Sequence, residues 1–434
     1  MQGITRRSFS KLNLGAAAFA ALAPSIKAFA ASARHPLVGK PWPGWKPGEF
    51  QVHFIYTGVA ESAFYIFPDG TTMLLDCGDH PAITRLELAV PVKPGPQRLA
   101  GDWIARYVQR VNPNGANVDY MELSHWHSDH GGTPRWVSSR REGYDGTSGC
   151  FRSGFALAAE TLHFRRAIDR GWPDYDEPMR GLPPEPVNVL DHMKRLYAWL
   201  GRRDGLEVEK FRLGARDQVV PLRNPAAAKG FEVFNLCANG KYVRKDGTVR
   251  DIYAEHIASA KPAYLNENGM SLGHIFTYGK FRLYTAGDFS DVLRTPSGKV
   301  MTEDLLAEAL PKVNVAKANH HAHYAMPAKL VAALAPQVWT ICVWDQLHSI
   351  AGDMARMADR SLYPGERVLC PGIFPRERRD EDAGSPWLAA VHASAFEGGH
   401  VVVNVAPGGD TYTVSYLTAE DESMTVRSVL KFDS

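Results

Sequence analysis

One stretch of nine residues constrains this chain more than any other: Ser124-His125-Trp126-His127-Ser128-Asp129-His130-Gly131-Gly132. Four of the nine are metal-ligand types, in the pattern His-x-His-x-Asp-His. Imidazole nitrogen and carboxylate oxygen are the ligands that first-row cations such as Zn²⁺ accept. The alternative is a polar loop that holds three histidines without a task, but the dense and ordered spacing favours coordination. The sequence therefore predicts a metal site here.

The residues before the motif indicate how its ligands divide between ions. Residues 118–123 mix β-branched, aromatic and aliphatic side chains, which is typical of a short strand. Side chains two residues apart in an extended segment point to the same side, so His125 and His127 are expected to bind one metal ion. Asp129 and His130 follow where the chain turns. They are therefore expected to serve a second ion.

Far along the chain, Asp288 is an acidic residue whose local sequence is compatible with metal binding. It follows a strand-like run over 281–285 and directly succeeds Gly287, which removes side-chain bulk beside a metal. An ionised carboxylate can donate one oxygen to each of two cations. The alternative is that Asp288 caps a following helix. If the run at 281–285 forms a hairpin with 273–278, position 288 faces about 269–271, near Asn268.

Strand and helix patterns predict an α/β fold. A helix is expected over 102–111, leading into the strand of the motif, and this β–α–β step is typical of a mixed sheet with helices on its outside. The apolar runs expected to form strands lie at 50–56, 62–67, 72–76, 313–317, 338–344, 401–405 and 412–417. The last two are expected to form a hairpin at an edge of the second sheet.

Residues 133–225 contain no cluster of ligand types. Helical patterns at 155–168 and 189–200 predict a long, helical insertion over one face of the fold, which would shape access to the site. His163 and His192 fall within these two patterns. Isolated helix histidines usually have no catalytic task, so a structural role is expected for both.

The motif resembles the hallmark of the metallo-β-lactamase-fold hydrolases, and the surrounding sequence looks most like their ComEC-type branch, named for a DNA-uptake protein. The resemblance extends from about residue 50 to 434. It implies one catalytic domain over 50–434, folded as an αββα sandwich of two mixed sheets with outer helices. It also implies that Ala286-Gly287-Asp288 is the Gly-Asp of the family, whose aspartate bridges two metal ions.

The resemblance assigns further roles near the site. The family shows His-His-Gly-Ser where this chain has His320-His321-Ala322-His323. We expect His321 to be the ligand and His320 to face the substrate or handle a proton, although the two roles could be reversed. His348, after the strand-like run at 338–344, is either a proton donor to the leaving group or a surface histidine.

Two more positions are expected to support the ions. Asp76 ends a strand-like run and resembles a carboxylate that orients the metal site; its alternative role is to form a turn before Gly78. Many superfamily members place a third histidine where this chain has Asn268; the ComEC-type branch, like this chain, lacks that histidine. Asn268 is therefore expected to coordinate weakly, or a water replaces it.

Together these features predict an enzyme with two divalent ions held by His125, His127, Asp129, His130, Asp288 and His321. Zn²⁺ is expected first, and Mn²⁺ is the rival because the site is rich in oxygen ligands. A metal-held hydroxide would attack an ester-type bond, with Asp129, His320 and His348 as catalytic residues. The resemblance to the ComEC-type branch implies phosphoesters and phosphodiesters ahead of β-lactams, thioesters and other esters. The alternative from another class is a non-catalytic exported protein that binds metal.

The N-terminal segment predicts export. Residues 5–11, Thr-Arg-Arg-Ser-Phe-Ser-Lys, have the twin-arginine form and precede a weakly apolar run over 12–24. A signal peptide is expected over 1–33, an extended Pro- and Gly-rich lead-in over 34–49, and a periplasmic location for the mature chain. No later stretch reaches the ~18 apolar residues of a spanning helix, so no membrane span is expected there.

Charge and cysteine content narrow the partners. The chain has 49 basic and 47 acidic residues, and its first 30 residues hold four basic ones and no acid, so the remainder is close to neutral. A near-neutral chain has no general attraction for nucleic acid, and the expected partner is a small-molecule or phosphoester substrate. The five cysteines are odd in number and widely spaced, so no disulfide framework is expected.

Overall fold

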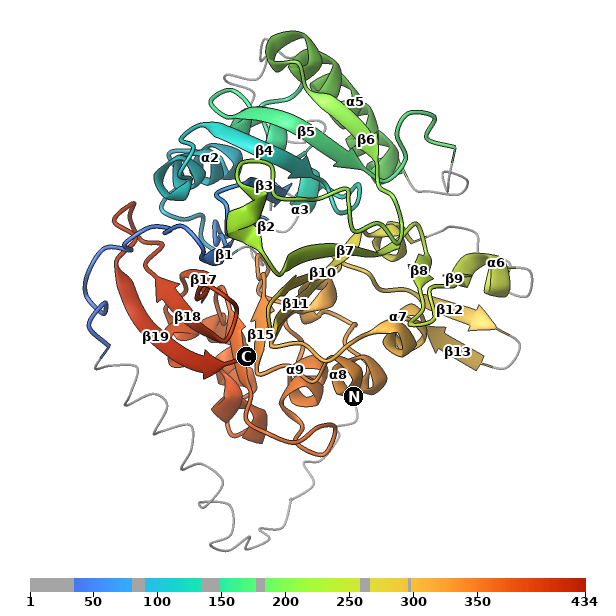
Figure 1. The fold of residues 1–434 in the computed structure, drawn as a ribbon. Helices are drawn as coiled ribbons and strands as arrows, with labels where there is room; N and C mark the ends of the chain where they lie inside the picture. The colour runs from blue at the N-terminus through green and yellow to red at the C-terminus, as the bar shows by residue number, and fades with distance from the viewer. Residues whose placement is uncertain (1–34, 80–89, 134–148, 177–183, 258–265, 296–297) are drawn as a thin grey trace, which may run out of the picture.

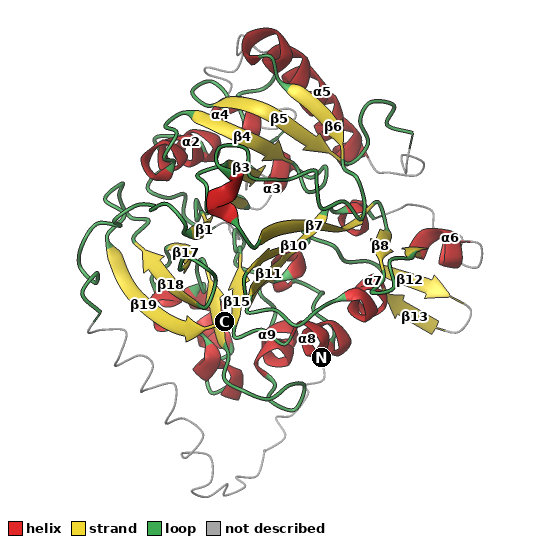
Figure 2. Ribbon diagram, in the orientation of Figure 1, coloured by secondary structure: helices red, strands yellow, loops and turns green. Residues whose placement is uncertain are grey.

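The computed structural model describes residues 35–79, 90–133, 149–176, 184–257, 266–295 and 298–434. They form an α/β architecture in which two large mixed sheets carry helices on their outer sides (Figures 1 and 2). The signal peptide expected over 1–33 lies outside the described residues. Within the described part of the chain, no helix combines the length and apolar character that crossing a membrane requires.

The first sheet has nine strands and contains the strand of the metal motif. Its order is β19 (Val426–Asp433), β18 (Thr411–Leu417), β17 (His400–Val405), β1 (Phe50–Phe54), β2 (Ser62–Ile66), β3 (Thr72–Cys77), β4 (Asn117–Glu122), β5 (His163–Asp169) and β6 (Glu207–Lys210). The strands from β3 to β6 are parallel, and those from β19 to β3 are antiparallel. Antiparallel hairpins and parallel crossovers thus share one sheet.

The second sheet has eight strands. Its order is β16 (Val368–Pro371), β15 (Val338–Ile341), β14 (Val315–Lys317), β11 (Phe281–Thr285), β10 (Gly273–Tyr278), β7 (Phe231–Ala238), β8 (Lys241–Val243) and β9 (Val249–Asp251). A separate hairpin joins β12 (Val292–Thr295) to β13 (Gly298–Met301).

Strand β2 shows how the layers are built. Ala63 and Tyr65 belong to the large apolar core that includes both sheets, whereas Phe64 and Ile66 belong to the core beneath the helices. This alternation follows from the two-residue period of a strand, which sends successive side chains to opposite faces. Every residue of β2 is buried, so the strand is covered on both sides.

Helices cover the outer faces of both sheets. Apolar side chains of α2 (Ala100–Val111), α4 (Gly154–Ala158) and α5 (Pro184–Asp204) pack in the same core as the outer face of the first sheet. The helices α7 (Thr302–Leu306), α8 (Ala328–Leu334) and α9 (Ala351–Ala358) contribute to the other core, beside the second sheet (Figure 1). The other α-helices of the described residues are α3 (Ser128–Gly131), α6 (Ile252–Ile257) and α10 (Arg376–Glu381).

The hairpin that carries Asp288 has the predicted register. His274 pairs with Thr285 and Tyr278 with Phe281, so the turn lies at Gly279 and Lys280. Extending this register places position 288 opposite 271, and the Asp288 backbone N–H donates to the Ser271 hydroxyl at 3.2 Å. The loop that holds Asp288 therefore lies at the end of the hairpin, as the sequence indicates.

Two secondary-structure predictions are wrong. The C-terminal hairpin of β17 and β18 belongs to the first sheet, because β17 pairs with β1 from Phe50↔Val405 to Phe54↔Val401, and β19 extends that sheet further. The pattern at 155–168 is not one helix but the short helix α4 followed by β5. The alternation of apolar residues along a strand does not show which distant strand is its partner. At 155–168, a short helix and a strand follow each other so closely that their apolar residues resemble one helical pattern.

The expected insertion at 133–225 thus contains sheet as well as helix. Its strands β5 and β6 continue the first sheet beyond β4, and α5 spans the helical pattern predicted at 189–200. The five cysteines are all buried, and none of them forms a disulfide.

Candidate metal centre

The loop after β4 is shaped by close backbone contacts. Its Asp129 carbonyl accepts the backbone N–H of Glu61 at 2.9 Å, and the Asp79 backbone N–H donates to the Ser128 carbonyl at 3.0 Å. A β-carbon on Gly78 would lie 1.6 Å from the Asp129 carbonyl oxygen, so glycine is required there. One turn of helix, α3, then projects Asp129 and His130 inward, where both are buried.

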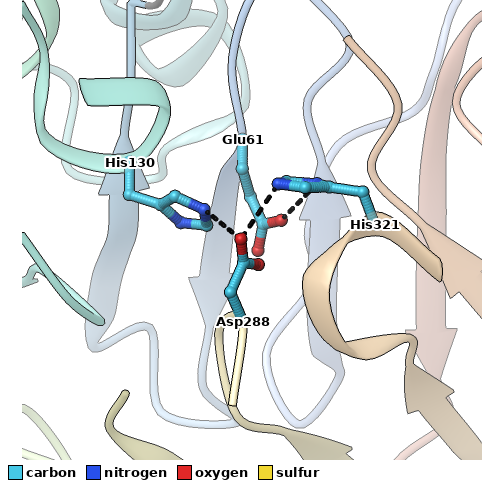
Figure 3. Close-up of side chains that lie close together, drawn as sticks. All are labelled: Glu61, His130, Asp288 and His321. Carbon is cyan, nitrogen blue, oxygen red and sulfur yellow. Dashed lines mark ion pairs between the residues drawn. The ribbon is translucent and has the colours of Figure 1, made fainter. Parts of the chain in front are cut away.

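Four buried side chains from distant segments converge on one point (Figure 3). Each offers one ligand atom, and these atoms all lie within 4.8 Å of one another: Glu61, His130, Asp288 and His321. One oxygen of Asp288, Oδ2, lies 3.2 Å from Nε2 of His130 and 3.1 Å from Nε2 of His321. This cluster could hold a metal ion.

The remaining predicted ligands adjoin this cluster. Asp129 Oδ2 lies 3.1 Å from Nε2 of His321 and 3.5 Å from Nε2 of His130. The ring of His125 brings its Nε2 to 4.0 Å from Asp288 Oδ2 and 3.0 Å from Nδ1 of His127. The structure therefore brings together all six residues predicted as ligands. His127 is the one among them that is partly exposed.

Hydrogen bonds behind the rings fix which nitrogen faces the centre. The Ser124 hydroxyl donates to Asp76 Oδ2 at 2.8 Å, so Ser124 must accept from the Nδ1–H of His125, 3.0 Å away. The Nδ1–H of His130 donates to Asp76 at 2.7 Å, and that of His321 donates to the Cys342 carbonyl at 2.9 Å. Each neutral ring therefore presents its Nε2 lone pair to the centre, as a metal-binding histidine does.

These lone pairs face carboxylate oxygens, which are also acceptors. Nε2 of His130 is buried and has no hydrogen-bond partner within the described part of the chain, although Asp288 Oδ2 is only 3.2 Å away. Acceptors that face each other across about 3 Å need a cation between them, either a proton or a metal ion. Imidazole and carboxylate are the donor set of Zn²⁺ and related ions, so these residues fit divalent cations.

The charges of the centre support the same conclusion. Burial alone would raise the pKa of Asp288, but the rings of His321 and His130 hold it well below its ordinary value. Burial likewise lowers the pKa of His321, but Asp288 and Asp129 outweigh it and raise the pKa to about 9. Without a metal, the buried carboxylates therefore favour the protonated form of the imidazole that faces them. A divalent cation would supply that positive charge instead.

Asp76 lies behind the rings, as predicted. It is fully buried and accepts from the Ser124 backbone N–H at 2.7 Å as well as from Ser124 Oγ and His130. Asn268 is buried, and its side-chain oxygen has no hydrogen-bond partner among the described residues. Its backbone follows Glu267, whose carboxylate accepts the Trp126 N–H of the motif at 2.8 Å.

The segment after β14 holds the other histidines. It is His321, rather than His320, whose Nε2 reaches Asp288. His320 is partly exposed, and its Nδ1 is buried without a partner among the described residues. The ring of His348 stacks on that of His321 with centroids 4.6 Å apart, and its Nδ1 is likewise unpartnered. His348 is thus beside the centre and buried, not on the surface.

Two residues of the centre were missed from the sequence. Glu61 precedes β2, and its Oε2 lies 3.3 Å from Nδ1 of His321, on the side of the ring that faces away from Nε2. Lys317 ends β14, and its fully buried ammonium lies 2.8 Å from Glu61 Oε1 and 3.4 Å from Asp288 Oδ1. Neither residue stands in a motif, so no local signal could have identified it.

The two helix-pattern histidines lie away from the centre. His163 begins β5, with its Nδ1 3.1 Å from Asp204, and its side chain is about half exposed. His192 is buried in α5, beside the ring of Phe151. Neither contacts a predicted ligand.

A scan against models of known protein families finds no match for this chain, and no curated protein matches it.

Proposed function

We propose that this protein is a metal-dependent hydrolase of the metallo-β-lactamase fold, most similar to its ComEC-type branch, which cleaves an ester-type bond with two divalent ions. The observation that carries the proposal is the convergence of His130 and His321 on a single oxygen of Asp288. The arrangement of two mixed sheets with outer helices is compatible with the αββα sandwich that this family adopts.

The ligands divide between two positions around Asp288. His125 and His127, whose facing nitrogens are 3.0 Å apart, would hold one ion. Asp129, His130 and His321 would hold the other, and Asp288 lies between the two groups. When bound, divalent ions supply a water that ionises near neutral pH and polarise the bond to be cleaved.

The protein's own groups would orient the histidine ligands and contact the leaving group. Asp76 and the Cys342 carbonyl hold the imidazoles of His130 and His321 in the orientation that faces the centre. His320 and His348 flank His321, and the Nδ1 of each has no partner among the described residues. Burial lowers the pKa of both rings, that of His320 to about 4, so each is proposed to act as a neutral hydrogen-bond donor to the leaving group. The left-handed backbone of His320, at φ 46°, orients its ring beside the centre.

A phosphoester or phosphodiester is the proposed substrate class, on the resemblance to the ComEC-type branch. Zn²⁺ is the proposed metal, because four of the six proposed ligands are imidazoles. Mn²⁺ is the alternative metal. Asn268 stands where many superfamily members have a third histidine, so the ion held by His125 and His127 would have fewer nitrogen ligands, which favours Mn²⁺. The twin-arginine pattern within residues 1–33 supports export to the periplasm.

The test is hydrolysis of bis-p-nitrophenyl phosphate by the metal-loaded protein, with Zn²⁺ or Mn²⁺ added. Turnover is expected with at least one of these metals, and Asp129→Ala and Asp288→Ala are expected to abolish it. Persistent turnover in both variants would overturn the mechanism. A wild-type protein that binds metal but hydrolyses no member of an ester panel would favour a non-catalytic, metal-binding role.

A further inference from the structure

A buried ion pair lies directly behind the metal motif. Arg170, which follows β5, and Glu267, in the short turn Glu267–Met270, both have fully buried side chains. The guanidinium donates twice, from Nε to Oε1 at 2.9 Å and from Nη2 to Oε2 at 2.7 Å. Its third contact, from Nη1, is to the Asn239 side-chain oxygen at 2.8 Å.

This pair contacts Trp126, the residue between His125 and His127. Glu267 Oε1 accepts the Trp126 backbone N–H at 2.8 Å, and the Arg170 guanidinium carbon lies 3.4 Å from the centroid of the indole ring. The indole is itself fully buried. The pair thus holds both the backbone and the side chain of Trp126, and through them the spacing of the two histidines.

The same pair also fixes the turn that carries Asn268. Glu267 is adjacent to Asn268 in the chain, so a carboxylate anchored on Arg170 and Trp126 restrains the backbone of that turn. The backbone N–H of Leu272 donates to the Ser124 carbonyl at 2.9 Å, which joins the far end of the turn to the motif as well. The pair of Arg170 and Glu267 therefore supports three residues that are expected around one metal ion: His125, His127 and Asn268.

A buried ion pair is weak evidence for a stabilising role. Two charges lose their hydration on burial, and replacing a buried ion pair with apolar residues of similar volume is often neutral or stabilising. A fixed, forked contact nevertheless holds its partners in one geometry, because the guanidinium and the carboxylate are planar and bond at two points.

We propose that Arg170 and Glu267 are positioning residues for the metal ion held by His125 and His127, and that they set the affinity of that ion and not of its neighbour. This inference rests on the metal-binding part of the proposed function. It does not depend on the substrate or on turnover.

The experiment is a calorimetric titration of metal-free protein with Zn²⁺, for the wild type and for the double variant Arg170→Met with Glu267→Leu. The double variant removes both charges together and leaves neither one buried alone. We expect it to bind one Zn²⁺ as the wild type does and the other about 10- to 100-fold more weakly, as is typical when a partner behind a ligand is lost. Titration with Co²⁺ adds a signature, because its absorption spectrum reports the coordination geometry at each step.

A matched control distinguishes positioning from loss of a buried pair. Glu122 and His274 are also fully buried and lie 2.7 Å apart, at a point where the two sheets meet, but neither contacts Trp126. The double variant Glu122→Met with His274→Leu should keep both affinities. Should the first double variant not fold, Arg170→Lys retains the charge and loses the fork, and a smaller loss at the same ion is expected.

The outcomes separate the two proposals. Two wild-type affinities in the Arg170 and Glu267 variants, or an equal loss in the control, would overturn the positioning role. A wild-type protein that binds no divalent ion would overturn the metal centre and with it the proposed function.

Discussion

Two loops from different sheets meet at Asp288, and they are held in place in different ways. The loop after β4, residues 124–131, has an ordinary backbone, with no positive φ among its residues. The loop after β14, residues 319–326, has five non-glycine residues in the left-handed region: His320, His321, Ala322, Tyr324 and Met326. Each such residue costs on the order of 1–2 kcal/mol, so the second loop requires external support.

That support comes from side chains of two helices. The backbone N–H of Ala325 donates to Asp353 at 2.8 Å, and that of Met326 donates to Glu303 at 2.9 Å. Arg356 donates to the carbonyls of the same two residues, at 2.9 and 2.8 Å. All four backbone polar groups of Ala325 and Met326 are therefore bonded to side chains from α7 and α9.

This difference shows which residues determine the geometry of each loop. In the first loop the ligands themselves are dense in sequence, and a strand end and one helical turn suffice to aim them. In the second loop, the orientation of the His321 ring depends on residues about 20 to 35 positions away in the sequence. No local sequence pattern links those residues to His321. The first loop is specified largely by its own sequence, and the second by the fold around it.

The largest expected effect comes from removing one imidazole from each loop. His130→Ala and His321→Ala each leave Asp288 Oδ2 with one facing ring instead of two. We expect each variant to lose more than ~100-fold in affinity for at least one Zn²⁺, beyond the 10- to 100-fold typical of outer partners. Calorimetric titration measures this loss, and the exposed His163→Ala serves as control. A loss confined to one of the two variants would show that the loops are not equal partners.

A smaller effect is expected behind the first loop, at Asp76. Asp76→Asn keeps the size and tolerates the left-handed backbone at φ 59°, but its amide cannot accept from Ser124 and His130 as a carboxylate does. Zn²⁺ affinity should fall about 10- to 100-fold with the fold retained. Glu61→Gln is the matching variant for the second loop, because Glu61 lies behind the ring of His321. Unchanged affinity in both would mean that neither carboxylate orients a ligand.

A third expectation tests the support of the strained loop. Arg356→Met leaves the carbonyls of Ala325 and Met326 without their side-chain donors, which should cost about 1–3 kcal/mol of unfolding free energy. Amide hydrogen exchange should accelerate at these two residues and not within 124–131. Arg98→Met, which removes an exposed pair with Asp102, is the control with little effect. Equal acceleration in both loops would remove the distinction drawn between them.

The same distinction explains what the sequence could predict. The motif at 124–132 predicts four ligand residues that lie together in the structure, and the hairpin pattern at 273–285 gave the bounds of β10 and β11 and the register that places Asp288. These predictions rest on periodicity and turns, which are local.

What the sequence did not predict depends on long-range contacts. Glu61, Lys317 and the pair of Arg170 with Glu267 stand in no motif, and the partners of the pair are 97 residues apart. The C-terminal hairpin was placed in the wrong sheet for the same reason, since only its pairing with β1 decides its place. The sequence patterns indicated which segments are strands, but the partners of those segments are a property of the whole chain.

The smallest effect on the metal centre is expected from Asp79, beneath the first loop. Its backbone N–H donates to the Ser128 carbonyl, and its side-chain Oδ2 is buried without a partner among the described residues. Burial raises the pKa of Asp79 from 3.8 to about 7, although Ser153 and the Gly154 backbone lower it in part. Between pH 4 and 7 the folded protein therefore keeps a proton that the unfolded chain has lost, and stability falls as pH rises through this window.

Asp79→Asn removes that dependence because an amide does not ionise. Relative to this variant, the unfolding free energy of the metal-free wild type should fall between pH 4.5 and 7.5 by at most about 4 kcal/mol, since each pKa unit corresponds to about 1.4 kcal/mol. Urea unfolding at several pH values measures the difference, and Zn²⁺ affinity should be unchanged. A difference that stays flat across this range would show that Asp79 is already ionised in the folded protein. The ordinary backbone of the first loop would then rest on a buried charge, and the contrast with the second loop would weaken.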